Sequence, residues 1–366
     1  MPSAIVIGAG VFGASLADRL VVEGWDVTLV ERDEPGHARA ESGGETRLIR
    51  CSHGTDALYA RSAWRALEMW RELGDDLLVE SGVAWFARRK DGWEADSEQV
   101  LRDLGIPVER LAPAEGARLF GGLTTGDLEF VLYEPEAGVL RAANAVRALT
   151  ARALENGARL VRAQARPDGG AVLVGGRRLE ADAVVWACGA WLGGLFDGLS
   201  LRVTVQNVVL FDASRDWRSP GWVDFDAAFY GHGLVEPHGF KVASDADGGD
   251  VDPDQRPLEA AVESVAAARD YLAHRFPALA DAAVASSPAC HYSLTADSNF
   301  IFAPHPEHDR VWLLGGGSGH GFKHGPAVAE HAAAVLAGRT TPEPRFALGE
   351  RTWARSLRTA GSRGVQ

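Results

Sequence analysis

The 366-residue sequence contains only three cysteines, Cys51, Cys188 and Cys290. Because they are odd in number and widely spaced, we do not expect a disulfide framework. We expect instead a reducing, cytoplasmic location. The sequence also has no apolar run long enough to span a bilayer. Its first apolar run, residues 4–7, is shorter than the core of a signal peptide and has no basic residues before it. We therefore expect no association with membranes.

Positive charge is also scarce, since 37 Lys and Arg stand against 50 Asp and Glu, which gives a net charge of -13. Such a chain repels nucleic acid and anionic membrane surfaces and is favoured to be soluble. The 46% of hydrophobic residues argues against disorder. The length exceeds what one hydrophobic core usually serves, so two lobes are expected.

Two catalytic patterns are missing. No G-x-S-x-G elbow is present, so a hydrolase of that kind is not supported. The stretch His305-Pro306-Glu307-His308 lacks the H-E-x-x-H spacing of a helical zinc site and is interpreted as a loop. No metal is predicted.

The first positive signal is a glycine-rich turn. Residues 4–7 and 26–31 are typical of strands and residues 11–22 of a helix, which together form a βαβ unit. The turn Gly8-Ala9-Gly10-Val11-Phe12-Gly13 fits the G-x-G-x-x-G pattern of dinucleotide-binding folds. The pattern alone does not separate NAD from FAD, and a glycine turn in an unrelated α/β protein also fits it.

Each glycine of the pattern has a physical task. Gly8 permits the tight turn, Gly10 lets the backbone approach a pyrophosphate, and Gly13 lets helix and strand pack closely. The helix N-terminus offers N–H groups and a positive dipole end to the phosphates. Glu31 ends the second strand, where a carboxylate would bind ribose hydroxyls. The predicted cofactor residues from this region are Gly8, Gly10, Val11, Phe12, Gly13, Glu31 and Arg32.

The later chain alternates between two kinds of segment. Residues 201–285 contain strand-like patches separated by Asp- and Gly-rich turns, which suggests an antiparallel sheet inserted into the first domain. An apolar strand at 310–314 runs into a glycine loop at 315–321. Further helices are expected at 56–73, 143–156, about 257–275 and from Pro326 to near Gly338, and further strands at 159–161 and 183–187.

Four segments carry a resemblance to a known family. They are residues 43–54, 134–140, 182–191 and 315–325. In order, they resemble the monomeric sarcosine oxidase and N-methyltryptophan oxidase family of FAD-dependent amine oxidases, within the D-amino acid oxidase-like superfamily. Pipecolate oxidase and fructosyl amino acid oxidases are relatives in that family. The resemblance runs from residue 4 to about residue 337.

The resemblance implies a fold of class α/β plus an antiparallel sheet. A Rossmann-type FAD-binding domain would comprise residues 1–80, 143–200 and 286–366. A mixed or antiparallel substrate domain, residues 81–142 and 201–285, would be inserted into it.

The resemblance also implies that FAD is bound covalently through Cys290, in Pro288-Ala289-Cys290-His291-Tyr292. A thiolate attacks the flavin 8α-methyl once the ring is electron-poor. The alternative is a buried structural cysteine, which is the usual fate of a free thiol. Cys51 and Cys188 match no attachment site.

The glycine loop at 315–321, followed by a helix start, is expected to place N–H groups against the flavin N1–C2=O edge and stabilise the anionic reduced flavin. The cofactor residues that the resemblance implies in addition to Cys290 are Gly43, Thr46, Gly189, Gly317, Gly319, His320, Gly321, Phe322 and Lys323.

Arg50 and Lys323 resemble the pair that binds the substrate carboxylate in this family; the alternative is a surface salt bridge. Asp245 falls where sarcosine oxidase has a histidine, which puts sarcosine itself in doubt. Its carboxylate would bind a second positive charge on the substrate or face solvent.

The catalytic positions implied by the resemblance are led by Lys241, which would promote the reaction with oxygen because a fixed cation stabilises superoxide. The alternative is an exposed strand lysine. Arg47 resembles a flavin-side arginine. Tyr230 and Tyr292 match active-site tyrosines, although a tyrosine is more often part of a core.

The predicted function is FAD-dependent oxidation of a secondary or cyclic amine with a carboxylate to an imine, by hydride transfer to the flavin, with O2 reduced to H2O2. The partners would be a small-molecule amine or amino acid and O2, with no nucleic acid and no membrane, and the protein would be a monomer. The alternatives are an amine dehydrogenase with another acceptor and an NAD-linked dehydrogenase.

Overall fold

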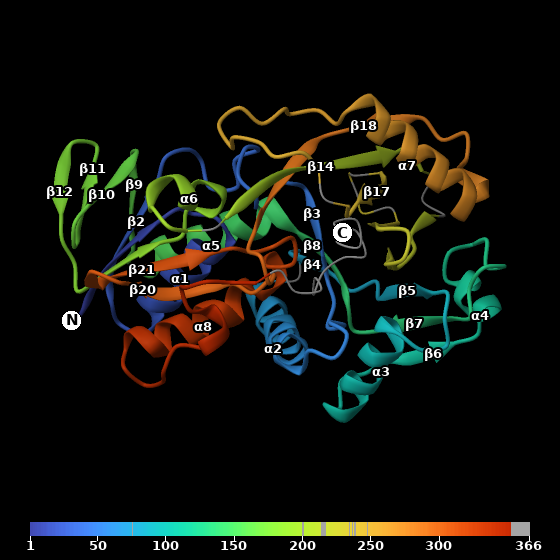
Figure 1. Ribbon diagram of the computed structural model, residues 1–366, viewed down its shortest axis with the longest axis horizontal. Helices are drawn as coiled ribbons and strands as arrows, with labels where there is room; N and C mark the ends of the chain where they lie inside the picture. The colour runs from blue at the N-terminus through green and yellow to red at the C-terminus, as the bar shows by residue number, and fades with distance from the viewer. Residues whose placement is uncertain are drawn as a thin grey trace.

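The protein is elongated, with a helix-covered sheet at one end and a second, larger sheet at the other (Figure 1). Both sheets draw strands from distant parts of the chain. The computed structural model describes residues 1–352 except 75, 200, 214–216, 234, 236, 238 and 247.

The first sheet has six strands in the order β20-β21-β13-β1-β2-β9. All neighbouring strands are parallel except β20 and β21. The strands are β1 (Ser3–Ile7), β2 (Asp26–Glu31), β9 (Arg159–Arg162), β13 (Ala183–Trp186), β20 (Ile301–His305) and β21 (His308–Gly315).

Alternation along β1 explains how both faces of this sheet are buried. Ala4 and Val6 face a core cluster formed with the helices, whereas Ile5 and Ile7 face a second cluster on the opposite side. Helix α1 packs between the other helices of the first face. The helices are α1 (Val11–Val22), α5 (Ala142–Glu155) and α8 (Gly325–Leu336), and the other face is covered by β10 (Ala165–Asp168), β11 (Ala171–Val174), β12 (Arg177–Leu179) and α6 (Leu192–Leu195).

The second sheet has nine strands, which are antiparallel except where β15 meets β5. Its aromatic core packs under α7 (Val262–Arg275). Its strands are β5 (Val83–Ala87), β6 (Glu109–Leu111), β7 (Phe130–Glu134), β14 (Arg202–Phe211), β15 (Gly221–Asp224), β16 (Phe229–His232), β17 (Phe240–Ser244), β18 (Val284–Ser286) and β19 (Ala289–Leu294).

A small sheet, β3-β8-β4, joins the two parts. The remaining elements are β3 (Thr46–Ile49), β4 (Leu78–Val79), β8 (Gly138–Arg141), α2 (Ala57–Leu73), α3 (Trp93–Asp103), α4 (Pro113–Arg118) and the 3-10 turns η1 (Gly189–Trp191), η3 (Pro277–Leu279), η4 (Phe322–His324) and η5 (Pro344–Phe346).

The predicted fold class and most predicted elements are confirmed. Helix α2 starts where its cap predicts, because the Asp56 carboxylate accepts from the N–H groups of Leu58 and Tyr59. The helix expected from about residue 257 begins only at Val262. Residues 259–260 pair with the chain before β19 instead, including an N–H of Ala260 that donates to Ser287 O.

The two domain ranges stay a prediction. All strands of the six-stranded sheet lie within the ranges expected for the first domain. Strand β19 also lies in those ranges, yet it pairs with β14 of the second sheet. The chain thus crosses between the two parts through continuous β-structure.

A buried ion cluster holds the second sheet together and yields a stability prediction. The Asp224 carboxylate, which is fully buried, accepts from Arg88, from the Tyr271 hydroxyl at 2.9 Å and from Arg275 Nη2 at 3.3 Å. Replacing Asp224 with Ala leaves the buried Arg275 guanidinium short of a partner, which costs about 3–5 kcal/mol. Urea unfolding should report this loss.

The matched control is Asp168→Ala, which removes the exposed partner of Arg178. That exposed pair should contribute little because water screens it. Equal urea midpoints for Asp224→Ala and Asp168→Ala would contradict the role given to the cluster.

Candidate functional site

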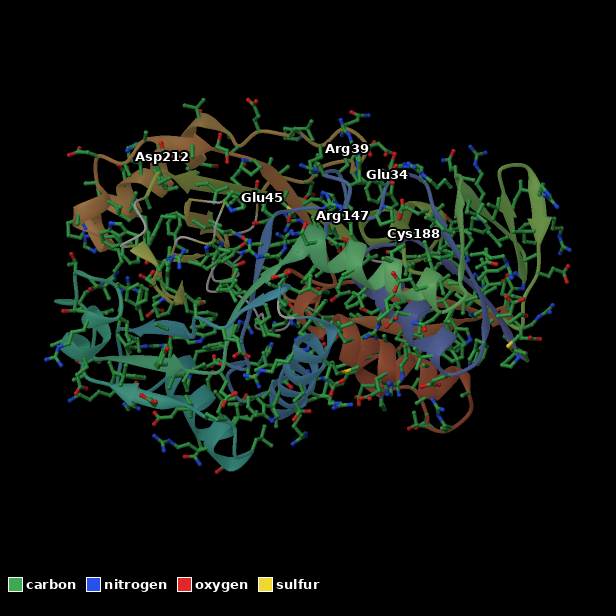
Figure 2. The ribbon with its side chains drawn as sticks, turned by 180° about the vertical axis from the view of Figure 1, so that it is seen from behind. Glu34, Arg39, Glu45, Arg147, Cys188 and Asp212 are labelled. Carbon is green, nitrogen blue, oxygen red and sulfur yellow. The ribbon has the colours of Figure 1, made fainter. Side chains whose placement is uncertain are left out.

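A cavity lies at the carboxyl ends of β1 and β2, against the N-terminus of α1. Two of its lining residues, Glu34 and Cys188, are labelled in Figure 2. The predicted cofactor residues that line it are Gly8, Gly10, Val11, Phe12, Glu31, Arg32, Gly189, Gly317, Gly319, Gly321 and Phe322.

Close packing at the glycines shapes this cavity. Gly8 has φ +100°, and a Cβ there would lie 2.4 Å from Ala187 O. A Cβ on Gly13 would lie 1.9 Å from Gly8 O, so α1 approaches the strand only because residue 13 lacks a side chain. Gly13 is not part of the lining; its role is packing.

The end of the cavity at α1 suits a dinucleotide. Gly10 is the N-cap of α1, so backbone N–H groups and the positive dipole end face the lining. The Glu31 carboxylate accepts from the N–H groups of Ala9 at 2.7 Å and Asp33 at 3.0 Å, which fixes it at the end of β2. The Arg32 guanidinium lies 4.8 Å from the Trp191 ring. These residues fit FAD, because the glycines leave room for its pyrophosphate and the Glu31 carboxylate can accept hydrogen bonds from its ribose hydroxyls.

Two lining residues were missed by sequence reasoning. The Ser42 hydroxyl accepts from the Val11 N–H at 3.0 Å, at the start of α1. The Glu41 carboxylate accepts from the N–H and hydroxyl of Ser293 at 2.8 and 2.9 Å, and burial raises its pKa. No local pattern marks these residues, since their partners are far away in the sequence.

Three of the predicted catalytic residues, Lys241, Tyr230 and Tyr292, share one face of the second sheet with Cys290, because their strands align them with even-numbered residues of β14. Tyr292 lies opposite Thr204 and Cys290 lies opposite Gln206. Lys241 lies opposite Leu210. Side chains that face each other across a ladder, or lie two residues apart on a strand, point to the same side.

Tyr230 completes this face. It pairs with Ala243, which itself lies opposite Val208 of β14. Its hydroxyl lies 3.1 Å from the Tyr292 hydroxyl, and burial raises the pKa of Tyr230. The two tyrosines come from β16 and β19, 62 residues apart, and meet only because β14 joins those strands into one sheet.

Arg47, on β3, lies against this face. Its Nη2 donates to Glu41 O at 2.7 Å and lies 3.4 Å from Cys290 Sγ. Its Nη1 donates to Thr46 O at 2.7 Å. Arg47 lines the cavity and is in contact with Cys290.

Lys241 is buried, with only 3% of its surface exposed. This differs from an exposed strand lysine. Its Nζ lies 3.3 Å from Thr46 O and 5.3 Å from the centre of the Tyr230 ring. Burial, with Arg47 nearby, lowers the pKa of Lys241 to about 7. Thr46 also lies 2.8 Å from the Nε2 atom of His232, a neighbour that sequence reasoning missed.

Arg50 and Lys323 are both buried, so neither belongs to a surface salt bridge. Arg50 Nη1 donates to Ser52 O at 2.7 Å, and its guanidinium lies 5.1 Å from the Trp85 ring. Lys323, in η4, donates to His320 O at 3.0 Å. Burial and the nearby Arg50 charge hold the pKa of Lys323 well below its usual value.

The buried carboxylate of Glu134 binds the two residues that follow Arg50. Glu134 accepts from the N–H of Cys51 at 2.6 Å, the hydroxyl of Ser52 at 2.6 Å and Trp85 Nε1 at 2.8 Å. It therefore fixes the segment that follows Arg50. Sequence reasoning found the stretch that begins with Glu134 but gave this residue no role.

Asp245 follows β17 and is half-buried. Its N–H donates to Ala228 O at 2.7 Å, and its negative charge acts to raise the pKa of Lys323. The structure thus places it on the side of the carboxylate-binding candidates. Its role in recognising a second substrate charge stays a prediction.

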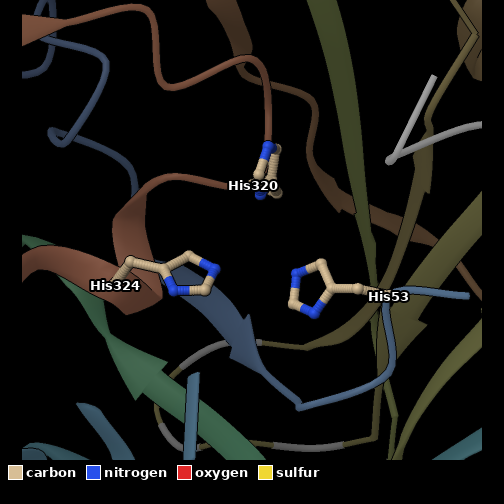
Figure 3. A group of neighbouring side chains, drawn as sticks. All are labelled: His53, His320 and His324. Carbon is tan, nitrogen blue, oxygen red and sulfur yellow. The ribbon is translucent and has the colours of Figure 1, made fainter. Parts of the chain in front are cut away.

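The remaining predicted residues do not line the cavity. Gly43 packs closely, since a Cβ there would lie 1.8 Å from His37 O. The His320 Nε2 atom lies 2.9 Å from Ser298 O, and its ring faces His53 and His324 (Figure 3). Cofactor roles for Gly43, Thr46, His320 and Lys323 stay predictions.

The three histidines are the metal-ligand-like group among the described residues. Each offers a nitrogen within 4.8 Å of the other two, and all are buried. His53 Nε2 already lies 2.9 Å from Arg50 Nη1. A metal would need that lone pair and would bring a second positive charge beside the guanidinium, which low-polarity surroundings make costly.

The sequence matches the profile of the family described as "FAD dependent oxidoreductase" over residues 3–335. Monomeric sarcosine oxidase of Bacillus sp. (strain B-0618) is 28% identical, with 92% of each chain covered. N-methyl-L-tryptophan oxidase of Yersinia pestis (strain Pestoides F) is 25% identical, with 92% of this chain and 95% of that chain covered.

Among solved structures, L-proline dehydrogenase from P. horikoshii superposes with a TM-score of 0.83 at 21% identity. The match covers 94% of this chain and 95% of that chain, and it shows a shared fold. In the part of the chain that the structure describes, none of the helices has both the length and the apolar character needed to cross a membrane.

The lowered pKa of Lys241 predicts a pH-dependent stability. An unfolded lysine holds its proton up to about pH 10.4, whereas folded Lys241 releases it near pH 7. Between these values the unfolded state binds more protons, so stability rises with pH. Relative to Lys241→Met, the wild type should gain stability from pH 7 to pH 10. Urea midpoints of both proteins, in the same flavin-loading state, measure the difference; a constant difference would show an ordinary pKa.

Proposed function

The chain belongs to the FAD-dependent oxidoreductase family, and from that premise we propose that it oxidises a secondary or cyclic amine bearing a carboxylate to the imine, with O2 reduced to H2O2. The named relatives that act on sarcosine and N-methyl-L-tryptophan support this substrate class. We further propose that FAD is attached to Cys290 and that the protein is a cytoplasmic monomer with no nucleic-acid or membrane partner.

The observation that carries the proposal is the shared face of Tyr292, Cys290, Tyr230 and Lys241 beside the cavity of the dinucleotide motif. A nucleophile, a buried cation and two phenols converge there. Bound FAD would supply the two-electron acceptor for the amine carbon.

The chain's own residues would then divide the work. Arg50 and Lys323 lie buried where a carboxylate would offset their charge. The lone pair of the substrate nitrogen has to be free of a proton for hydride to leave the neighbouring carbon. Lys241 would place positive charge where oxygen gains an electron.

A dehydrogenase that passes electrons to another acceptor is the second candidate. The likeness to L-proline dehydrogenase supports it at the level of the fold. The buried Lys241 favours the oxidase, since its protonated amine would stabilise the superoxide formed when oxygen gains an electron.

Substrate charge tests the proposed function directly. A panel of N-methyl and cyclic amino acids should be turned over in air with peroxide formed in equal amount. Arg50→Met should raise KM for the acids roughly tenfold or more, because it removes a charged hydrogen bond. Substrates whose carboxylate is replaced by an amide serve as the control. Equal turnover of acid and amide by the wild type would contradict the assignment.

Attachment of FAD through Cys290 predicts that yellow colour stays with the protein after acid precipitation. The contact of the Cys290 thiol, at 3.4 Å, with Nη2 of the cavity-lining Arg47 supports an attachment point at the cavity wall. Cys290→Ala should release its FAD into the supernatant, whereas Cys188→Ala should retain it. Colour released wholly from flavin-loaded wild type would reject the linkage.

Oxygen activation by Lys241 predicts a split between the two half-reactions. Removing a preorganised charge costs about a hundredfold in rate, so Lys241→Met should slow reoxidation by air to that degree. Anaerobic bleaching of the flavin by substrate should change little. Stopped-flow absorbance measures both rates; an unchanged reoxidation rate would leave Lys241 as a strand residue only.

A further inference from the structure

His53, His320 and His324 form a buried triad whose rings face one another beside Arg50 (Figure 3). They come from the segment after β3, from the glycine loop and from η4. Each is at most 4% exposed. The catalytic residues proposed above do not include them, so their presence beside a candidate substrate-binding cation requires another explanation.

The hydrogen bonds fix the proton position of His53. Its Nδ1 lies 2.9 Å from Cys51 O, and because a carbonyl only accepts, Nδ1 carries the hydrogen. Its Nε2 therefore holds a lone pair and accepts from Arg50 Nη1 at 2.9 Å. Burial, together with the charges of Lys323 and Arg50, holds the pKa of His53 well below its usual value. His53 is thus a neutral acceptor for a guanidinium.

Arg50 is held by one edge only. The hydrogen bonds it makes within the described residues both come from Nη1, to Ser52 O and to His53 Nε2. The planar guanidinium presents further N–H groups at Nε and Nη2, in the fork geometry that matches a carboxylate. Fixing Nη1 therefore sets the direction of the fork.

The other two histidines make hydrogen bonds of their own. His320 Nε2 lies 2.9 Å from Ser298 O, so Nε2 carries its hydrogen. His324 Nδ1 lies 2.9 Å from the Ser62 hydroxyl. Burial, and to a lesser extent the charge of Lys323, hold the pKa of His324 well below its usual value. With their pKa values held low, His53 and His324 add no repulsion beside Arg50.

We infer that His53 is a positioning residue for substrate recognition: its Nε2 lone pair orients the Arg50 guanidinium toward the substrate carboxylate. This rests on the proposed function, in which Arg50 binds that carboxylate. The occupant of the site is an amino acid or other small carboxylate, and His53 acts on it only through Arg50.

Two polar substitutions separate the two ring nitrogens. His53→Gln keeps an acceptor near the Nε2 position, whereas His53→Asn keeps a donor near Nδ1, toward Cys51 O, and loses that acceptor. Propionate titrated into the flavin-loaded enzyme, followed by flavin absorbance, is the probe, with propionamide as the uncharged control. Loss of a hydrogen bond to a charged group corresponds to roughly tenfold or more in affinity.

The expected result is propionate binding weakened about tenfold in His53→Asn and within about threefold of wild type in His53→Gln, with propionamide binding equal in both. A role in folding alone would shift the thermal midpoint without this acid-specific difference. Equal propionate affinity in the Asn and Gln variants would overturn the inference. Stoichiometric zinc or copper in the purified wild type would also overturn it, because the Nε2 lone pair would then belong to the metal.

Arg50→Met separates this inference from the proposed function. Unchanged propionate binding in that variant would mean that Arg50 binds no carboxylate, and the substrate proposal would fail first. Weakened binding in Arg50→Met together with unchanged binding in His53→Asn would reject only the role of His53. His324→Gln is the matched control. Within the described part of the chain, His324 hydrogen-bonds to the Ser62 hydroxyl and not to Arg50, so its replacement should leave propionate affinity unchanged.

Discussion

Three basic side chains, Arg50, Lys241 and Lys323, are buried, and a fourth, Arg47, is half-buried where it lines the cavity, so the surrounding structure has to compensate for the loss of water. Burial of charge is costly unless each group is hydrogen-bonded. Here the compensation comes mainly from backbone carbonyls, those of Glu41, Thr46, Ser52 and His320. Carbonyl dipoles can hold a cation without cancelling its charge. Such a group stays available to an anionic substrate or cofactor.

The local parts of the fold were predictable. The glycine turn, α1 and the cap at Asp56 depend on residues within a few positions of each other, so the sequence displays them directly. Helix α7 was placed too early because Glu259, before it, pairs with Pro288, 29 positions away and just before β19. Strand pairing over such distances leaves no periodic trace in the pairing segment itself.

The site was predictable only through the resemblance. Lys241 and Thr46 are 195 residues apart, and Arg47 and Cys290 are 243 apart. Spacing alone gives no reason to bring them together. Glu41, Glu134 and His53 were missed for a related reason. They hold other residues in place, namely strands, turns and a guanidinium, and sequence motifs consist mainly of residues that take part in the chemistry themselves.

Strand β14 sets the positions of functional residues on the strands beside it. Cys290 lies opposite Gln206 and Lys241 lies opposite Leu210, so the two are offset along β14 by four residues, about 13 Å at 3.3 Å per residue. Insertions in the loops that connect the neighbouring strands would leave both positions unchanged. One residue inserted in β14 between Gln206 and Leu210 would instead turn either Cys290 or Lys241 to the opposite face of the sheet. The loops of this region can therefore vary in length, whereas the length of β14 is fixed.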